Sequence, residues 1–357
     1  MNKRSLSFRK QNGLTLLEIL VAITIGLMVV AGTIQIYLGT SETYRFQNAL
    51  SRIQENGRFA MQHIQREVRM AGFMGCTQNI KNWLNPSGSG YVENFFSGVG
   101  VVGWEASGTA PSDNYTLGTT TTWSNGSGDV LPSELGSNLQ PGSDVFVVSR
   151  AVPADITLSG NPSPPANTLH AQGATGIPQR ALIIAVKHDC SGGDFWQKTS
   201  NESSVTLPKG VASGFGPGNI NPDGGFSVEH DDQSEILQLI NRVYFIRTGA
   251  SGQPSLFTQA IGPVSGNAQE LIRGVENMQV IYGVNSGGNL EYRTADNISD
   301  WSQVVAARVS LLLMDGAHVN VDAPNAVNLG GTIITPTQSN RLRQVFSTTV
   351  GIRNNLP

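Results

Sequence analysis

The sequence is poor in the residues on which most catalytic and metal sites depend. It holds two cysteines and five histidines in 357 residues. The cysteines form no Cys-x-x-Cys pair, so a zinc site is not indicated. The histidines are dispersed, without metalloprotease spacing; they are His63, His170, His188, His230 and His318. No local pattern therefore indicates an enzyme or a cofactor, although a Ser-His-Asp site assembled only in space stays open.

Charged residues are also scarce, because Asp, Glu, Lys and Arg make up only 14% of the chain. The net charge of −3 becomes −7 once the four positive charges of residues 1–13 are set aside. This balance argues against nucleic acid as the main partner. Glycine is abundant, with 41 residues, and Ser, Thr and Asn crowd the middle of the chain. Such a composition is typical of a loop-rich, exported β protein.

One glycine motif deserves comparison with cofactor sites. The residues from Gly98 to Gly103 fit the string G-x-G-x-x-G. Dinucleotide binding requires that turn to follow a strand and to open a helix. Residues 104–111 make a poor helix start, so we predict no cofactor here.

An acidic segment is the strongest metal candidate in the sequence. Carboxylate oxygens on a loop could hold calcium. The spacing is not that of an EF-hand, however, and Asp232 with Glu235 could equally cap the start of an element. A solvated acidic loop therefore stays open beside a calcium site. The residues concerned are Asp223, Glu229, His230, Asp231, Asp232 and Glu235.

The amino-terminal segment carries the clearest functional signal. Residues 1–13 contain four basic residues and no acid, and an apolar run follows from Leu14 to Leu38. The run is long enough to span a bilayer of roughly 30 Å, and the basic leader predicts a cytoplasmic amino terminus. Glu18 places a carboxylate inside this run, where it is costly unless it has a partner. A simple signal anchor is the alternative interpretation.

This junction resembles the class III leader of type IV pilins and type II secretion pseudopilins. The resemblance makes Gly13 the last leader residue, Leu14 the first mature residue and Glu18 the fifth. It implies cleavage between Gly13 and Leu14 by a prepilin peptidase and methyltransferase, which also N-methylates Leu14. It further implies that Glu18 pairs, during filament assembly, with the terminal amine of a neighbouring subunit.

After Leu38 the apolar pattern becomes amphipathic, which predicts that the helix continues to Ala71 and stops at Gly72. Apolar or small residues recur there at spacings of three and four. We therefore expect a leader at 1–13, a membrane or filament-core half at 14–38, an amphipathic half at 39–72 and a β-rich body at 73–357. The stripe comprises Phe46, Leu50, Ile53, Gly57, Ala60, Ile64, Val68 and Ala71.

The body reads as strands separated by loops. Its β-branched and aromatic runs predict strands, and regular α/β alternation is absent, so an antiparallel sheet is favoured. The segment 85–142 reads as loop. The fold class is therefore α+β and pilin-like, with one long helix packed on an antiparallel β body. The predicted strands are 145–149, 181–186, 237–246, 278–284, 304–313 and 345–352.

Three further segments are similar to PilW-type minor pilins: residues 56–60 with 69–76, residues 274–283 and residues 341–350. The resemblance implies a structural minor pilin that helps to prime type IV pilus assembly, within a minor-pilin complex at the tip. Expected partners are other minor pilins, the major pilin, a tip adhesin and the inner membrane. The body would lie in the periplasm before assembly and in the pilus afterwards. A J-type pseudopilin and a membrane-tethered adhesin are the rival interpretations.

The two cysteines, Cys76 and Cys190, could form a disulfide if the body is exported. Outside the cytoplasm a disulfide between them is chemically permitted, and we expect it to form. Two free buried thiols are the alternative.

Overall fold

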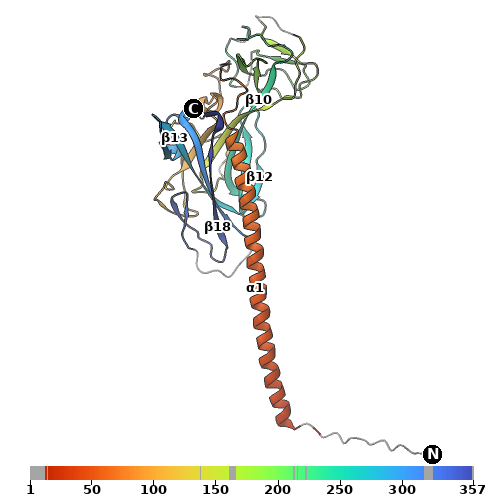
Figure 1. Ribbon diagram of the computed structural model, residues 1–357, viewed down its shortest axis with the longest axis vertical. Helices are drawn as coiled ribbons and strands as arrows, with labels where there is room; N and C mark the ends of the chain where they lie inside the picture. Colours follow the sequence, from red (N-terminus) through yellow and green to blue (C-terminus); the bar gives the residue numbers. More distant parts are fainter. Residues whose placement is uncertain are drawn as a thin grey trace, which may run out of the picture.

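A long helix carries a β-rich body at its carboxyl-terminal end (Figure 1). The computed structural model describes residues 13, 15–136, 138–160, 166–211, 214, 216–221, 223–316 and 325–355. Helix α1 spans Leu16–Arg69, and its first half projects from the body as a stalk. Leu14 and residues 1–12 lie outside the described residues. The predicted combination of one long amino-terminal helix and β sheets is confirmed.

Local sequence explains both ends of α1. At the start, Thr15 and Glu18 form a capping box that satisfies free main-chain N–H groups. At the end, Met70 is the C-cap and Gly72 adopts a φ of +75°, which favours glycine. The helix thus ends at Arg69, two residues before the predicted Ala71. Its 54 residues give a length of about 81 Å.

The body is built on a large sheet in the order β1-β8-β7-β10-β5-β2-β4, which β11 and β12 extend beside β10. Strand β10 is the longest in this sheet and pairs with β5 along one edge. Its other edge pairs first with β7 and then with β11. The strand bounds are β1 Ile80–Asn82, β2 Val101–Ala106, β4 Trp123–Ser124, β5 Val145–Pro153, β7 Leu182–Val186, β8 Gly193–Gln197, β10 Glu235–Thr248, β11 Pro254–Ile261 and β12 Gln269–Arg273.

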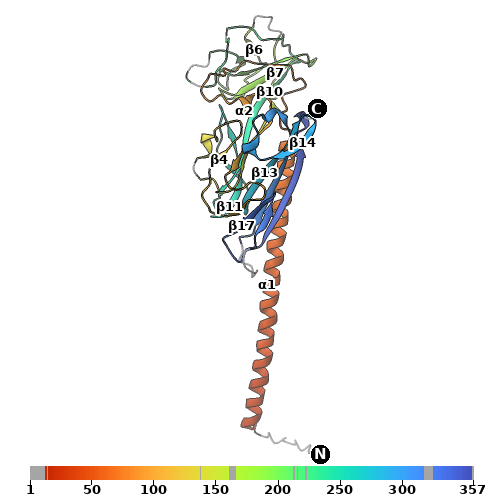
Figure 2. The same ribbon diagram turned by 90° about the vertical axis from the view of Figure 1, so that its left-hand side faces the viewer.

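A smaller sheet, in the order β14-β13-β15-β18, lies beside the second half of α1 (Figure 2). Two minor sheets complete the body, one with the order β16-β17-β3 and one formed by β6 and β9. The bounds of these strands are β3 Asn114–Thr116, β6 Thr168–His170, β9 Thr206–Pro208, β13 Val275–Ser286, β14 Asn289–Arg293, β15 Val304–Met314, β16 Val327–Leu329, β17 Thr332–Thr335 and β18 Arg343–Gly351. The short helices are α2 Glu93–Phe96, η1 Ser133–Leu135, η2 Ala295–Asn297, η3 Trp301–Gln303 and η4 Arg353–Asn355.

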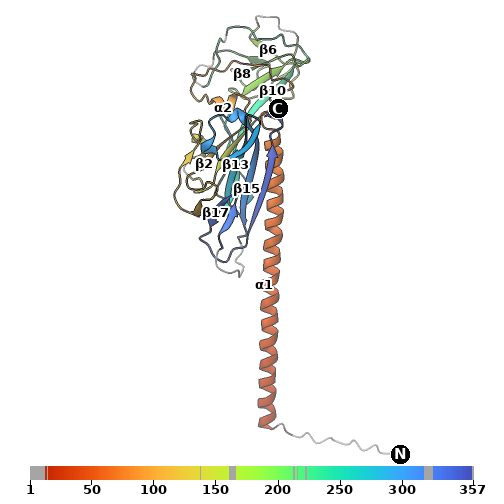
Figure 3. The ribbon, with the colours of Figure 1, turned by 60° about the vertical axis from the view of Figure 1, so that its left-hand side comes forward.

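The apolar interior is divided. The main core joins the buried stripe of α1 to both larger sheets. A second core, which includes Ile183, Trp196 and Leu207, fills a distal lobe that contains β6–β9 and lies farthest from the start of α1 (Figure 3). Strand β10 runs between the two regions, because Ile236 belongs to the second core and Val243 to the main core.

The six strands predicted from sequence are confirmed, and most of them are longer than predicted. The prediction of a loop throughout 85–142 is wrong, since β2 is buried along its whole length in the large sheet. Gly98 and Gly100 just before β2 and Gly103 within it hide the strand pattern. Within the residues that the structure describes, the expected antiparallel pairing has two exceptions, because β1 pairs with β8 and β17 pairs with β3 in parallel.

Candidate functional site

The amino end of α1 presents a carboxylate held in a defined position. Glu18 Oε2 accepts hydrogen bonds from Thr15 N at 2.9 Å and from Thr15 Oγ1 at 3.0 Å. The main-chain N of Glu18 donates in turn to Thr15 Oγ1 at 3.3 Å. The carboxylate therefore points back toward the predicted cleavage junction, near the positive end of the helix dipole. Gly13 and Glu18 are both exposed.

The first half of α1 is apolar and uncovered. Within the described residues, α1 is the helix that is long and apolar enough to cross a membrane, and no residue of its most apolar stretch is buried. Leu16, Met28 and Ile36 are 77%, 75% and 71% exposed. Apolar surface of this extent requires lipid or protein around it. The helix can therefore serve as a membrane anchor or as the core of an assembly.

The second half of α1 is fixed to the body by one buried stripe. Burial begins at Ala49 and continues through Ile53, Gly57 and Ile64 to Val68. These positions recur every three or four residues and so lie on one face. The members Phe46 and Leu50 of the predicted stripe are less covered than the rest.

Charged side chains reinforce this attachment. Arg52 pairs with Asp315, with Nε 2.8 Å from Oδ2. Glu67 is buried in α1 and pairs with Arg150 of β5 through two hydrogen bonds of 3.2 Å. Together with the apolar stripe, these pairs make α1 and the body one mechanical unit.

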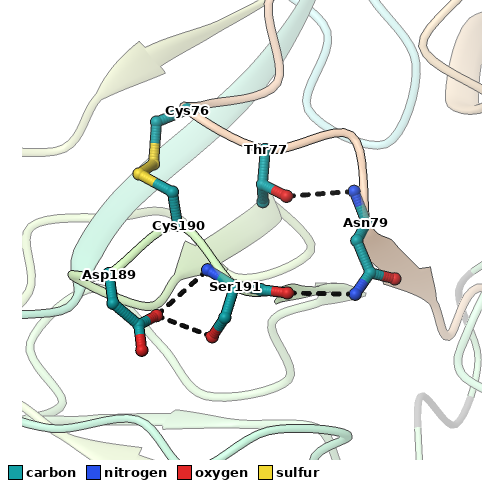
Figure 4. Close-up of a disulfide and its surroundings, with 6 residues drawn as sticks. All are labelled: Cys76, Thr77, Asn79, Asp189, Cys190 and Ser191. Atoms are coloured by element: carbon teal, nitrogen blue, oxygen red, sulfur yellow. Dashed lines mark hydrogen bonds between the residues drawn. A yellow bond between two sulfur atoms is a disulfide. The ribbon is translucent and has the colours of Figure 1, made fainter.

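The structure joins Cys76 to Cys190, whose Cα atoms are 5.6 Å apart (Figure 4). The bond ties the segment after α1 to the distal lobe and closes a loop with a sequence separation of 114. In the chain-entropy treatment, a disulfide that closes a loop of this length stabilises the folded state by roughly 4–5 kcal/mol. Around it, Asn79 Nδ2 donates to the Ser191 carbonyl at 3.0 Å, and Asp189 accepts from Ser191 N at 3.0 Å. The hydrogen bonds from Ser191 hold the pKa of Asp189 well below its usual range.

The acidic segment does not converge on a common point. The carboxylate of Asp231 accepts from Ser234 Oγ at 3.0 Å and lies 2.6 Å from His188 Nδ1. Asp223, Glu229 and Asp232 are exposed, as is Glu235 at the start of β10. Within the described ranges, no three His, Cys, Asp or Glu side chains are arranged to hold a metal ion. Asp231 instead shapes the turn before β10.

His230 turns away from this segment into the distal lobe. Its Nε2 lies 2.8 Å from Asp194 Oδ2, and both side chains are fully buried. Burial opposes the ionisation of Asp194, but hydrogen bonds from His230, Trp83 and Ser227 outweigh it and lower the pKa of Asp194. Ser227 Oγ donates to the Gly193 carbonyl at 3.4 Å. This His-Asp pair is therefore a structural link. The Ser227 hydroxyl bonds a main-chain carbonyl and not the ring of His230.

The other histidines lie apart from one another. His63 on α1 is 3.2 Å from the hydroxyl of Tyr244, and burial lowers the pKa of His63. His170 is exposed on β6, and His318 lies outside the described residues. Within the chain that the structure describes, no serine hydroxyl is bonded to a histidine ring.

The segment Gly98–Gly103 forms the turn and first half of β2, so it does not open a helix. Gly98 and Gly100 have φ values of +82° and +88°. A Cβ at Gly103 would overlap the Tyr282 hydroxyl. Positive φ values favour glycine at 98 and 100, and close packing requires it at 100 and 103, which gives the motif a structural explanation.

Sequence reasoning missed several buried polar groups. Glu105 of β2, Asp144 beside β5, Ser149 of β5 and Asn241 of β10 are all 2–3% exposed. The burial of Glu105 could be expected from the largely apolar run Val101–Ala106, which is typical of a strand covered on both faces. The burial of Asn241 follows from the alternation of β10 in the same way.

Comparison with known families finds two matches, one at the start of α1 and one in the body. Residues 8–34 match the prokaryotic N-terminal methylation motif. Residues 243–354 match PilW, the type IV pilus-assembly protein W. No curated protein and no solved structure matches the chain.

The chain thus carries a PilW domain behind a prepilin methylation motif, as the sequence resemblance predicted. The PilW match runs from the middle of β10 to η4 and includes residues 274–283 and 341–350. Residues 56–60 and 69–76 lie outside it. The two matches support the role of a type IV pilus minor pilin with a membrane-capable anchor.

Proposed function

We propose that the chain is a structural minor pilin that helps to initiate a type IV pilus from a minor-pilin complex at the tip. In this proposal a membrane peptidase hydrolyses the Gly13–Leu14 bond, and the new amine of Leu14 is methylated. The observation that carries the proposal is the exposed apolar half of α1 with Glu18 held at its amino end. The PilW match favours a pilus over a secretion pseudopilus.

The electrostatics of Glu18 suggest how assembly would be guided. An ammonium group at Leu14 of one subunit can neutralise the Glu18 carboxylate of the next where water is scarce. Glu18 is the only acidic residue in the run 14–38. A single charge pair in an otherwise apolar contact would fix the axial register of two helices. Partners in this scheme are the major pilin, other minor pilins and a tip adhesin.

The body is proposed to act through its surface and without catalysis. Before assembly it would lie in the periplasm, with α1 in the inner membrane and the leader in the cytoplasm. The distal lobe lies at the end opposite the anchor, which suits a position near the filament tip (Figure 3).

Mass spectrometry of purified filaments tests the proposal. We expect a mature amino terminus at a methylated Leu14 and the chain at low abundance in the fibre. A Gly13→Ala variant should keep its leader and be absent from filaments. Detection of filaments that contain the uncleaved chain would contradict the proposal.

A further inference from the structure

A cleft of about 850 Å³ opens on the large sheet where β10 ends. Its lining comes from residues 138–141, from the end of β10, from β11 and from β12 with the residue just before it. Residue Leu139 forms a bridge to Arg247 of β10, so these four segments lie side by side. The volume lies within the range of about 300–1,000 Å³ that is usual for small-ligand sites.

The cleft lies on the face of the sheet that is turned away from α1. The Tyr244 hydroxyl of β10 lies 3.2 Å from the ring of His63 on α1, so the side chain of Tyr244 is directed toward the helix. Successive side chains of a strand point to opposite faces, so Phe245 and Arg247 are directed away from the helix. A ligand in the cleft therefore does not compete with the contacts of α1.

The side chain of Arg247 is held in place by two aromatic rings. Its guanidinium carbon lies 4.2 Å from the ring centroid of Phe257 and 5.7 Å from that of Phe245. Both rings are buried, and their centroids are 5.9 Å apart in a stacked arrangement. Cation–π attraction to a ring face leaves the N–H groups of a guanidinium free, because these donors lie in its own plane. Arg247 is therefore oriented before any ligand arrives.

The donors of Arg247 are unused and reachable. Within the described part of the chain, no carboxylate or other acceptor is bonded to its guanidinium. Arg247 is half-buried, and none of its nitrogen atoms is among the buried polar atoms that lack a partner. Glu270 of β12 also lines the cleft, but it lies two strands away, at about 10 Å. Its Oε1 accepts from Ser255 Oγ at 2.9 Å and lies 3.4 Å from Arg273 Nε.

These features define the chemistry of the ligand. A fixed guanidinium fork matches the two oxygens of a carboxylate or of a phosphate. The Glu270 carboxylate in the same cleft disfavours a ligand with several negative charges, so a carboxylate fits better than a phosphate. The side chains of Leu139 and Phe257 add apolar surface for the body of the ligand.

We propose that this cleft binds a ligand through one carboxylate, which pairs with the free N–H groups of Arg247. The carboxylate belongs either to a small organic acid or to a protein segment that enters the cleft. The inference goes beyond the proposed function and does not depend on it, because the site is complete within one chain.

Ligand-observed NMR titration of the full chain in detergent tests the chemistry. The probes are hippurate, which joins a carboxylate to an apolar ring, and hippuramide, which has nearly the same shape without the charge. We expect hippurate to bind the wild type about tenfold or more tightly than hippuramide, and Arg247→Gln to lose this preference. Arg58→Gln removes an exposed arginine of α1 and should bind as the wild type does.

Arg247→Lys keeps the positive charge but lacks the fork, so it should also bind hippurate more weakly, even if Arg247→Gln does not fold. Equal binding of the two probes by the wild type, or undiminished binding by a folded Arg247 variant, would overturn the proposal. Tighter binding of phenyl phosphate than of hippurate would overturn the choice of a carboxylate.

A second experiment distinguishes the two sources of the carboxylate. A benzophenone amino acid replaces Asn138, which is exposed and lines the cleft, and cells that produce the chain are irradiated. A protein source predicts a cross-linked peptide with a carboxylate beside the attachment point, and its yield should fall about tenfold or more in Arg247→Gln. A free acid predicts instead that denaturation of the purified wild type, but not of Arg247→Gln, releases an organic acid. A product that persists equally in Arg247→Gln, or neither product in the wild type, would overturn the proposal.

Discussion

The ring of Phe346 on β18 packs against Gly57 of α1 in the space that a side chain at position 57 would occupy. Three ring atoms would overlap a Cβ built on this glycine. The absence of a side chain at one helical position therefore lets α1 approach the small sheet closely. The contact lies in the middle of the buried stripe, between Ile53 and Ala60.

Gly57→Ala should lower stability although alanine is the better helix former. The helix gains about 1 kcal/mol in propensity, but the ring must move, and overpacking costs typically 1–3 kcal/mol. We expect a net loss of about 1 kcal/mol in the free energy of unfolding, measured by chemical denaturation in detergent. The additional change Phe346→Leu should recover much of this loss. Gly39→Ala is the matched control, since nothing lies within 4 Å of its added Cβ.

A second close relationship joins β13 to β18. Arg343 Nε and Nη2 donate to the two carboxylate oxygens of Glu276 at 2.6 and 2.9 Å. Both side chains are less than one-tenth exposed, at 8% and 7%. The pair is therefore desolvated, and neither charge can exchange its partner for water.

Arg343→Met should destabilise the body by about 3–5 kcal/mol, because it leaves the Glu276 carboxylate buried without its cation. The double variant with Glu276→Leu removes both charges and should be much closer to the wild type. Thermal unfolding followed by circular dichroism measures the difference. If the double variant were as unstable as the single one, lost packing rather than an unpaired charge would be the cause.

The structural features that depend on local periodicity and composition can be predicted from the sequence alone. The stripe through Ile53, Ile64 and Val68 follows from helical spacing, and the exposed run after Glu18 follows from hydropathy alone. The acid at Glu18 stands out because its neighbours are apolar. These features need no knowledge of distant residues.

The remaining features depend on pairings across the chain. Arg52 meets Asp315 across 263 positions, and no local pattern selects that partner. Strand β2 was missed because Gly103 breaks its apolar pattern, although glycine is needed there to admit the Tyr282 hydroxyl. The change of partner along β10, from β7 at Leu239 to β11 at Asn241, likewise depends on segments far apart in the sequence.

Buried acids link the two larger sheets. Asp144 accepts main-chain hydrogen bonds from Ala106 of β2 at 3.0 Å and from Val280 of β13 at 2.8 Å. Burial, assisted by the charges of Asp144 and Asp296, raises the pKa of Glu105 to about 10. Burial also raises the pKa of Asp144 to about 7. Glu105 is therefore neutral in the folded protein at physiological pH.

This shift predicts a pH effect with a definite sign. In the unfolded chain Glu105 ionises near its ordinary pKa of 4.5, whereas the folded chain retains the proton up to about pH 10. Its contribution to stability is complete below the unfolded value and is lost as the pH rises toward the folded one. Glu105→Gln cannot ionise, so its stability relative to the wild type should increase between about pH 5 and about pH 9.

Chemical denaturation of both proteins across this range measures that difference. Glu229→Gln, at an exposed position, should run parallel to the wild type. A constant difference between Glu105→Gln and the wild type at every pH would contradict a protonated Glu105.

The proposed role of Glu18 in filament assembly can be separated from its role in capping the helix. Glu18→Ala removes both the carboxylate and one half of the capping box, whereas Thr15→Ala removes the two hydrogen bonds of the Thr15 hydroxyl and keeps the charge. Both variants should insert into the membrane and be cleaved after Gly13, because neither change touches the leader. We expect Glu18→Ala to lower incorporation into filaments by about tenfold or more, since a neighbouring amine would lose its counter-charge in an apolar contact.

Thr15→Ala and Glu42→Ala, the latter at an exposed acid farther along α1, should assemble at close to the wild-type level. Quantitative mass spectrometry of sheared filaments against the membrane pool gives the ratio for each variant. A loss in Thr15→Ala equal to that in Glu18→Ala would assign the effect to helix capping, because the carboxylate is intact in that variant.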